Sequence, residues 1–520
     1  MRVRAYRDAW ASFPARLPTG GAERTARKAR APASASHTVR IGNRGQLLLK
    51  RLRHPLHFIA IEESMATETE KTRSDQPGVW KGRPPGMPRT VPPPSIPLAF
   101  LAASPFGLLA TGAAWIWARG AAATAPGADS VVAAVHFGVL ATLAMAVLGA
   151  MHQFTPVITG RPLRSSLLGR LTFASFLVAS WTLPLGVATK QVVVTAVAGA
   201  MVGVAVVLLV INLAPALAVK GKGSPVAALR IAVAGAVATG FMGVLFVGDR
   251  QGNWFTLSGH VDMAMGVVGL FGWLGMTYVG VAEKLWPMFM LSHLPGRHRS
   301  GGLAVWGIAL GVALSAPGLA YNLGWLAWPG AALVAGGLGA HLTSLAAHVR
   351  HRRRQPDLHL AYVLTSAFFL PVGAGLALAA VWIMRDDYHA GVALAAAAAA
   401  AFGGWVLVAL VGHAYKVVPF IVWSVLRSQG VATGPEGKPL MFADLYNHTW
   451  AAISYVTVAA GMAALCLGLG FRNPESIAAA GALLAATATV TAADLAMIPL
   501  RMLRQPGTPA GPTIVPLGHD

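Results

Sequence analysis

The sequence predicts an all-α, polytopic membrane protein with about twelve transmembrane helices. Two observations support this fold class. Only 12% of the 520 residues are charged, and apolar runs of helical length follow one another from about residue 95 onward. A run of about twenty apolar residues crosses the hydrocarbon core as a helix. In lipid, each backbone polar group must be bonded within its segment, so such runs become helices. A transmembrane barrel is excluded because the runs are continuous and do not alternate.

The runs and the loops between them define the expected helices. Gly and Ala are frequent inside the runs, as expected where membrane helices pack closely. The expected spans are 96–118, 128–157, 166–188, 191–219, 226–247, 259–290, 301–320, 323–349, 358–384, 389–424, 445–470 and 475–502.

Basic residues in the loops predict the orientation. Alternate loops hold Arg161 and Arg164; Lys220 and Lys222; Arg297 and Arg299; Arg350, Arg352, Arg353 and Arg354; Arg427 and Lys438. The opposite loops hold at most one each, namely Arg119, Lys190, Arg250, Arg385 and Arg472. Cytoplasmic loops are enriched in Lys and Arg, so both termini are expected in the cytoplasm of a multi-pass protein of the inner (plasma) membrane.

Three regions are expected along the chain. Residues 1–94 form a basic extension expected to be disordered, in which Met65 opens a more ordinary start, and this extension is set aside from the functional argument. Residues 95–505 form the membrane domain, and 506–520 a short tail. The net charge of +22 is explained by this extension and by topology, so anionic lipid is the expected partner and nucleic acid is not. The single cysteine, Cys466, excludes an intrachain disulfide.

Three helices end with a similar pattern, spaced one copy per four helices. Pro156, Pro287 and Pro419 lie 131 and 132 residues apart, each with Gly seven residues earlier and Gln or Lys three residues earlier. Chance recurrence of Gly and Pro is the alternative, since both are common in membrane helices. The equal spacing instead predicts three quasi-equivalent arcs of four helices. The glycines are Gly149, Gly280 and Gly412, and the residues three before proline are Gln153, Lys284 and Lys416.

Twelve helices in three arcs, with the Gly-x6-Pro endings and a histidine on the second helix, resemble subunit I of the haem-copper oxidase superfamily. The resemblance covers roughly residues 95–505. It implies that the second, sixth and tenth helices are inner ones that carry haem and copper ligands, and that other membrane or cytochrome subunits are partners. The seventh helix has no histidine, and the tenth lacks a His-x-His pair. Oxygen reduction at a haem-copper centre is therefore not expected.

Histidines near the start of these helices are the candidate cofactor ligands. The resemblance assigns haem to His136, with His389 or His260 as further ligands. His260 and Met263 lie one turn apart, and imidazole beside thioether suits copper(I). The alternatives are a packed, hydrogen-bonded histidine and a methionine that fills the core.

Ionisable residues near the opposite ends of the helices suggest a proton path. Its candidates are His152, Glu283, Lys284, His413 and Lys416, and Tyr415, His341, His348 and His359 lie nearby. Ionisable groups inside a membrane are costly and mark function by default. The alternative is that they sit near the interface, where Lys extends to water.

Three functions remain open. The first is a haem-binding membrane protein with an electron-transfer or nitric-oxide- or oxygen-related role, as the resemblance implies. The second is a transporter or copper-handling protein, and the third is a non-catalytic assembly partner that kept the fold. The sequence has no phosphate-binding loop, no covalent c-type haem motif, no His-Glu-x2-His and no nucleophile elbow.

Overall fold

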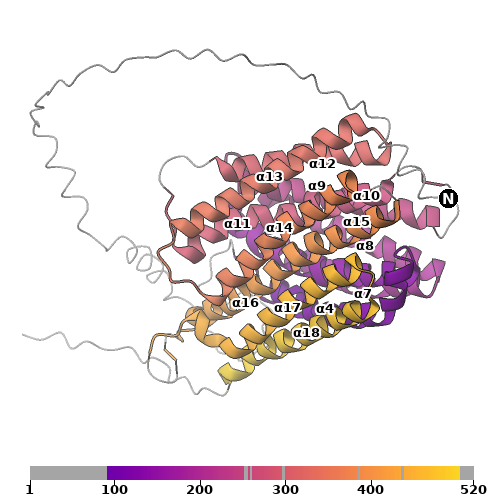
Figure 1. The fold of residues 1–520 in the computed structure, drawn as a ribbon. Coiled ribbons are helices and arrows are strands. Elements are labelled where there is room, and N and C mark those ends of the chain that lie inside the picture. The colour runs from indigo at the N-terminus through magenta and orange to yellow at the C-terminus, as the bar shows by residue number, and fades with distance from the viewer. Residues whose placement is uncertain are drawn as a thin grey trace, which may run out of the picture. The chain divides into compact units, whose positions relative to one another are not determined.

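The computed structural model describes residues 91–250, 254, 256–257, 260–294, 299–384, 387–431, 433–434 and 438–503. Within these residues, twelve helices are long and apolar enough to cross a membrane, and no β-strand occurs (Figure 1). The predicted all-α class is therefore confirmed for these residues, and so is the predicted number of helices that could cross a membrane. Residues 1–90 of the basic extension and the tail from 504 onward lie outside the described residues, as do Arg297 and Arg385.

The helices follow the predicted boundaries closely, and a short 3-10 turn, η5 (Phe442–Leu445), lies before the last two. The spans are α4 (Ser95–Thr124); α5 (Asp129–His136), η2 (Phe137–Ala144) and α6 (Met145–Thr159); α7 (Ser166–Ala188); α8 (Val192–Leu217); α9 (Ser224–Arg250); α10 (Val261–Val267), η3 (Val268–Leu274) and α11 (Gly275–Met290); α12 (Ser300–Ala320); α13 (Gly324–Arg350); α14 (Leu358–Trp382); α15 (Asp387–Ala399), η4 (Ala400–Leu407) and α16 (Val408–Ser428); α17 (His448–Gly470); α18 (Pro474–Leu503).

The second, sixth and tenth spans each contain a π-helical segment, which the sequence analysis did not predict. In all three, this segment begins nineteen residues before the proline, at Phe137, Val268 and Ala400. A π-helix bonds i to i+5 and is rare, usually marking a functional position. The π-helical segments therefore recur at the same spacing as the Gly and Pro residues.

These three spans are also the most buried. In the most apolar 18-residue stretch of each of these spans, between 56% and 78% of the residues are buried. In the other nine spans this share is at most 44%. They contact one another directly, since α6 packs on α11 and both η2 and η3 pack on η4. Each span contacts the next along the chain, and α18 returns to pack on α4. The second, sixth and tenth spans are therefore enclosed by the others.

Small residues allow the closest helix crossings. A Cβ atom added to Gly112 of α4 would lie 2.4 Å from the carbonyl oxygen of Gly481 in α18. A Cβ atom added to Gly235 of α9 would lie 2.3 Å from the carbonyl oxygen of Gly272 in η3. Without a hydrophobic drive between helices in lipid, such close backbone contact is the usual source of association.

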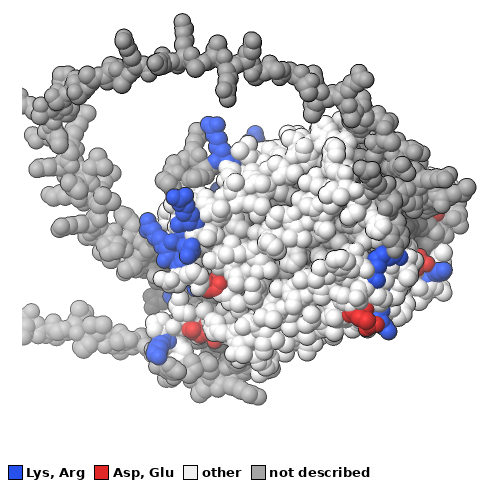
Figure 2. All heavy atoms as spheres, viewed as in Figure 1, with Lys and Arg blue, Asp and Glu red and all other residues white. Residues whose placement is uncertain are grey.

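The outer surface is apolar along the helices. Phe241, Leu303 and Phe368 are each more than 60% exposed. In Figure 2 the charged side chains gather at the two ends of the helices, and the visible side between them lacks Lys, Arg, Asp and Glu. An apolar surface of this extent fits contact with a lipid bilayer. We call the end that carries Arg350, Arg352, Arg353 and Arg354 the basic end.

Candidate functional site

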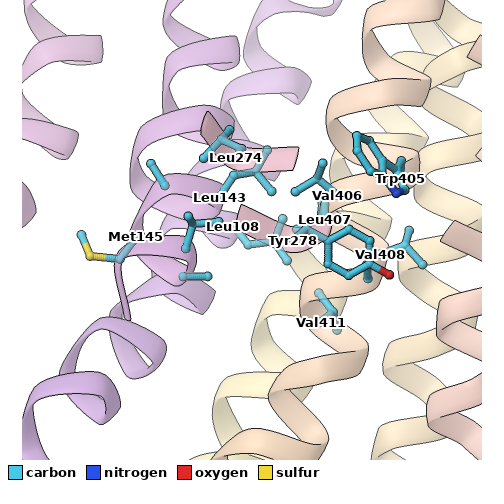
Figure 3. Close-up of a cluster of buried hydrophobic side chains, with 14 of the residues drawn as sticks. Leu108, Leu143, Met145, Leu274, Tyr278, Trp405, Val406, Leu407, Val408 and Val411 are labelled. Carbon is cyan, nitrogen blue, oxygen red and sulfur yellow. The ribbon is translucent and has the colours of Figure 1, made fainter. Parts of the chain in front are cut away.

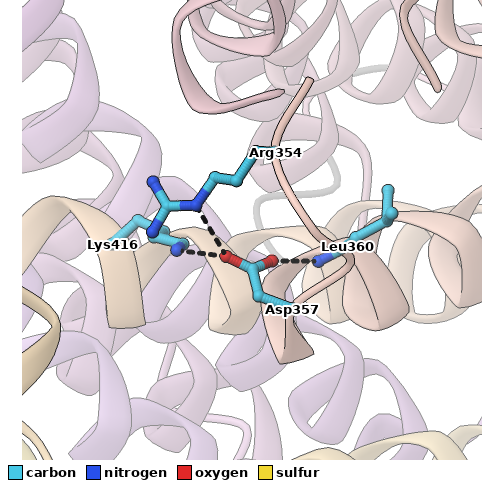
Figure 4. A network of polar contacts seen from close by, with 4 residues as sticks. All are labelled: Arg354, Asp357, Leu360 and Lys416. Atoms are coloured by element: carbon cyan, nitrogen blue, oxygen red, sulfur yellow. Dashed lines mark hydrogen bonds and ion pairs between the residues drawn. The ribbon is translucent and has the colours of Figure 1, made fainter. Parts of the chain in front are cut away.

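An ion pair between a buried lysine and a partly exposed aspartate lies at the basic end between α14 and α16 (Figure 4). The Lys416 amine is 2.5 Å from Oδ2 of Asp357, and its side chain is only 3% exposed. Arg354 approaches the same carboxylate oxygen at 3.9 Å. The other oxygen, Oδ1, accepts a hydrogen bond from the backbone N–H of Leu360 at 3.1 Å and so caps α14. A buried amine needs such a partner because desolvation penalises an isolated charge.

An aromatic ring completes this network. The Lys416 amine lies 5.5 Å from the centre of the Phe442 ring, and the Arg354 guanidinium lies 5.9 Å from it. Both distances are within the range of cation–π attraction. Phe442 belongs to η5, so the loop before α17 covers this network. We call Arg354, Asp357, Lys416 and Phe442 the ion network.

Two buried imidazoles lie next to the ion network. The ring centres of His359 in α14 and His413 in α16 are 4.7 Å apart, at an interplanar angle of 77°. His413 precedes Lys416 by three residues, so the two side chains share a face of α16. His359 is near enough to His413, Lys416 and Arg354 to feel their charges. Nε2 of each ring is buried and has no hydrogen-bond partner among the described residues.

The tautomer of His413 follows from its contacts. Its Nδ1 lies 2.8 Å from the backbone carbonyl oxygen of Ala409, one helical turn earlier. Because a carbonyl oxygen only accepts, Nδ1 carries the proton and Nε2 presents a lone pair. His413 is therefore poised as a buried proton acceptor next to His359.

Aromatic rings extend this pair further into the protein. Tyr278 of α11 lies 5.6 Å from His413 and 5.7 Å from His341 of α13, measured between ring centres. Trp286 lies 4.7 Å from His341 and 6.4 Å from His348. Nδ1 of His348 is 2.7 Å from the Ser292 hydroxyl. We call His341, His348, His359, His413, Tyr278 and Trp286 the histidine–aromatic cluster.

The cluster extends deep into the membrane domain. Tyr278 lies twelve residues before the end of α11 at Met290, which corresponds to about 18 Å along the helix. Figure 3 shows Tyr278 and Trp405 among buried side chains of α4 and the three π-containing spans. Buried ring contacts therefore connect the basic end with the middle of the domain.

At the inner end of the histidine–aromatic cluster lies a cavity of about 70 Å³. This volume is the space that the centres of water molecules can occupy. The second, sixth and tenth spans each contribute a lining residue at three equivalent positions, which makes nine residues in all. These positions lie nine, six and two residues before the proline of each span. We call this space the central cavity. The equivalent sets are Val147, Tyr278 and Leu410; Ala150, Val281 and His413; Phe154, Leu285 and Val417.

The residues predicted for a proton path fall into different surroundings. His413 and Lys416 lie together, next to His359. His152 is buried, but its ring stacks on Phe100 of α4 at 5.2 Å. The Glu283 carboxylate lies against Gly301 at the start of α12, and one of its oxygens is buried without a hydrogen-bond partner among the described residues. Lys284 is exposed.

The candidate cofactor ligands lie on three different spans, and none of them lines the central cavity. His136 is half-buried at the end of α5, where its Nδ1 bonds to the carbonyl oxygen of Val132 at 2.7 Å. His260 is buried just before α10, and Met263 is half-buried one turn further on. His389 is exposed on α15. Among the described residues, no group of three or more His, Cys, Asp or Glu is placed to hold a metal ion.

The sequence analysis did not identify four members of the site, namely Asp357, Phe442, Tyr278 and Trp286. Asp357 directly precedes a helix, and this capping position was a usable signal. Nothing local in the sequence distinguishes Tyr278 or Trp286 from other buried aromatic residues, because their role depends on rings from other helices. In comparison with known proteins, the sequence matches no protein-family model and no curated protein.

Proposed function

We propose that this protein passes protons between its basic end and the middle of the membrane through the ion network, His359 and His413. The single observation that supports this function is the contact of two buried imidazoles with unpartnered Nε2 atoms, directly beside the Lys416–Asp357 pair. Ionisable groups are rare inside membrane proteins and usually mark substrate or proton paths.

The chemistry of the groups supports proton transfer. Asp357 is one-third exposed, so its carboxylate is within reach of water and of Lys416. His413 accepts a proton at Nε2 while its Nδ1–H stays bonded to the carbonyl oxygen of Ala409. The resulting imidazolium then gives up the same proton from Nε2 to the next base. Imidazole is the side chain whose unperturbed pKa suits transfer near neutral pH.

The proposed architecture is the three-arc arrangement of haem-copper oxidase subunit I. Its support is the equal offset of the three π segments and the nine equivalent residues around the central cavity. In this arrangement the basic end faces the cytoplasm of the inner (plasma) membrane, because Lys and Arg are enriched on that side. Proton uptake would then start from the cytoplasm.

Deuterium exchange at the imidazole C2–H, followed by mass spectrometry of the full chain in lipid nanodiscs, tests the proton path. This exchange requires the imidazolium and access of solvent base. We expect His359 and His413 to exchange several-fold faster than His152, which is equally buried but stacks on Phe100. The substitution Lys416→Met should speed exchange at both, because it removes a positive charge that disfavours the imidazolium.

The matched control is Lys190→Met at the opposite end, where the amine is 81% exposed and 3.6 Å from Asp129. It should leave the exchange of His359 and His413 unchanged. Exchange at these two residues as slow as at His152, or unaffected by Lys416→Met, would exclude the path.

Haem binding at His136 is the second candidate function. One observation favours it: the Nδ1–H of His136 donates to the carbonyl oxygen of Val132, so Nε2 is the ring nitrogen that carries the lone pair. Metal-binding histidines usually donate their other ring N–H in this way. A bound haem would supply one-electron chemistry, and His136 would hold and orient it.

A reduced-minus-oxidised visible spectrum of the purified protein tests this second function. Sharp α and β bands that disappear in His136→Ala, but persist in His351→Ala, would support it. His351 is the matched control because its Nδ1 makes the same bond to the carbonyl oxygen four residues earlier. A colourless protein after expression with added haem would exclude haem binding.

A further inference from the structure

We propose that the central cavity binds one small, uncharged, apolar molecule between Val147, Tyr278 and Leu410. This inference concerns a ligand site and does not depend on proton transfer along the histidine–aromatic cluster. It follows from the chemistry of the wall, from the size of the cavity and from the difference among the three equivalent spans.

The wall is mostly apolar, and its serine and threonine hydroxyl groups are already bonded. Leu, Val, Ala, Pro and Phe side chains form most of it. The Ser104 hydroxyl donates to the carbonyl oxygen of Thr142 at 3.0 Å, and the Thr142 hydroxyl pairs with Thr111 at 3.1 Å. The Thr277 hydroxyl donates to the carbonyl oxygen of Trp273 at 2.9 Å.

Such a wall disfavours water. A buried water needs two to four polar partners, and genuinely apolar cavities stay dry and take up apolar solutes. The remaining polar side chains among the lining residues are those of His413 and Tyr278. A charged ligand is excluded because its desolvation would be too costly.

The size of the cavity limits the ligand. The space open to the centres of water molecules is only about 70 Å³, so the site admits one small molecule. The contacts of the nine equivalent residues would surround such a molecule from all three inner spans.

A difference among the three equivalent spans explains why space remains. Fourteen residues before the proline, the sixth and tenth spans carry Trp273 and Trp405, which are both almost fully buried. The second span carries Thr142 at this position, and Thr142 lines the cavity. Thr142 therefore fills less of the cavity wall than a larger side chain at the same place would.

Noble-gas crystallography of the full chain tests this site, with xenon as the probe. We expect an anomalous-scattering peak between Val147, Tyr278 and Leu410 after pressurisation. The substitution Ala150→Leu places a larger side chain in the cavity and should abolish the peak. Ala113→Leu, at an exposed position of α4, is the matched control and should retain it.

Ala414→Leu fills the same cavity from the tenth span and replaces Ala150→Leu if that variant does not fold. Ordered waters in the cavity without a xenon peak would overturn the inference, as would a peak that survives both substitutions. Neither result bears on the histidine exchange experiment, so the two proposals fail separately.

Discussion

The second span (α5, η2, α6) and the tenth span (α15, η4, α16) share a backbone plan and differ in what their side chains contact. Both have a π segment nineteen residues before a proline. Both carry a buried histidine whose Nδ1 bonds at 2.8 Å to the carbonyl oxygen four residues earlier. His152 stacks on Phe100, whereas His413 meets His359, Tyr278 and Phe289.

This difference shows that the repeated backbone does not by itself create the candidate site. Trp405 of the tenth span contacts Tyr278 and His341. The equivalent residue in the second span is Thr142. The tenth span has Lys416 three residues before its proline, with Asp357 as partner, and the second span has the neutral Gln153. Both spans border the central cavity, and only the tenth span also contributes to the histidine–aromatic cluster.

The largest effect on the free energy of unfolding is expected at Trp405. Trp405→Ala should lower the free energy of unfolding by about 3–5 kcal/mol, because it leaves a cavity in a packed core. The ring is 1% exposed and lies 5.8 Å from Tyr278, and a Cβ atom added to Gly275 would meet it at 2.8 Å. Detergent-based equilibrium unfolding measures this loss. A loss no greater than that of Thr142→Ala would contradict the contrast between the spans.

The ion pair comes next. Asp357→Ala removes the cap of α14 and the partner of Lys416, so we expect a loss of about 2–4 kcal/mol from the two contributions. The control Asp129→Ala breaks an exposed pair with Lys190 and should cost less than about 1 kcal/mol. Thermal unfolding of the two variants side by side checks this ordering, and equal losses would show that Lys416 needs no partner.

The two histidines should respond differently to the same substitution. Phenylalanine is close to histidine in shape, so His152→Phe and His413→Phe should each change stability by less than about 1.5 kcal/mol. Their effect on C2–H exchange at His359 should differ, with His413→Phe slowing it several-fold and His152→Phe leaving it unchanged. If both variants slow the C2–H exchange of His359 equally, His152 is coupled to the histidine–aromatic cluster.

The smallest effect is expected at Thr142. Thr142→Val removes its hydrogen bond to Thr111 and keeps the volume of the side chain. Interhelical hydrogen bonds in membrane proteins contribute about 0.6 kcal/mol on average, so the change in unfolding free energy should be of that order. Steric trapping in bicelles resolves such differences. A loss above about 2 kcal/mol would show that Thr142 has a structural role beyond this bond.

The fold could be read from the sequence to a large extent, and the site only in part. The spans at 166–188 and 301–320 were predicted to within one residue of α7 and α12. The π segments were not predicted, since a shift of one hydrogen-bond register has no signature in hydrophobicity. His413 and Lys416 were identified as path residues because they are ionisable groups near the end of the tenth span. Asp357 was not identified, because only its capping position marks it in the sequence and its partner Lys416 is distant.

The sequence alone determined the number of helices, their boundaries and the concentration of basic residues in alternate loops, because the bilayer imposes length and polarity on each segment independently. The tertiary structure decided which buried groups meet. His359 and His413 contact each other, and Tyr278 reaches His341, because helices distant in sequence pack side by side. Such contacts depend on the relative rotation of neighbouring helices, and hydrophobicity in lipid does not fix that rotation.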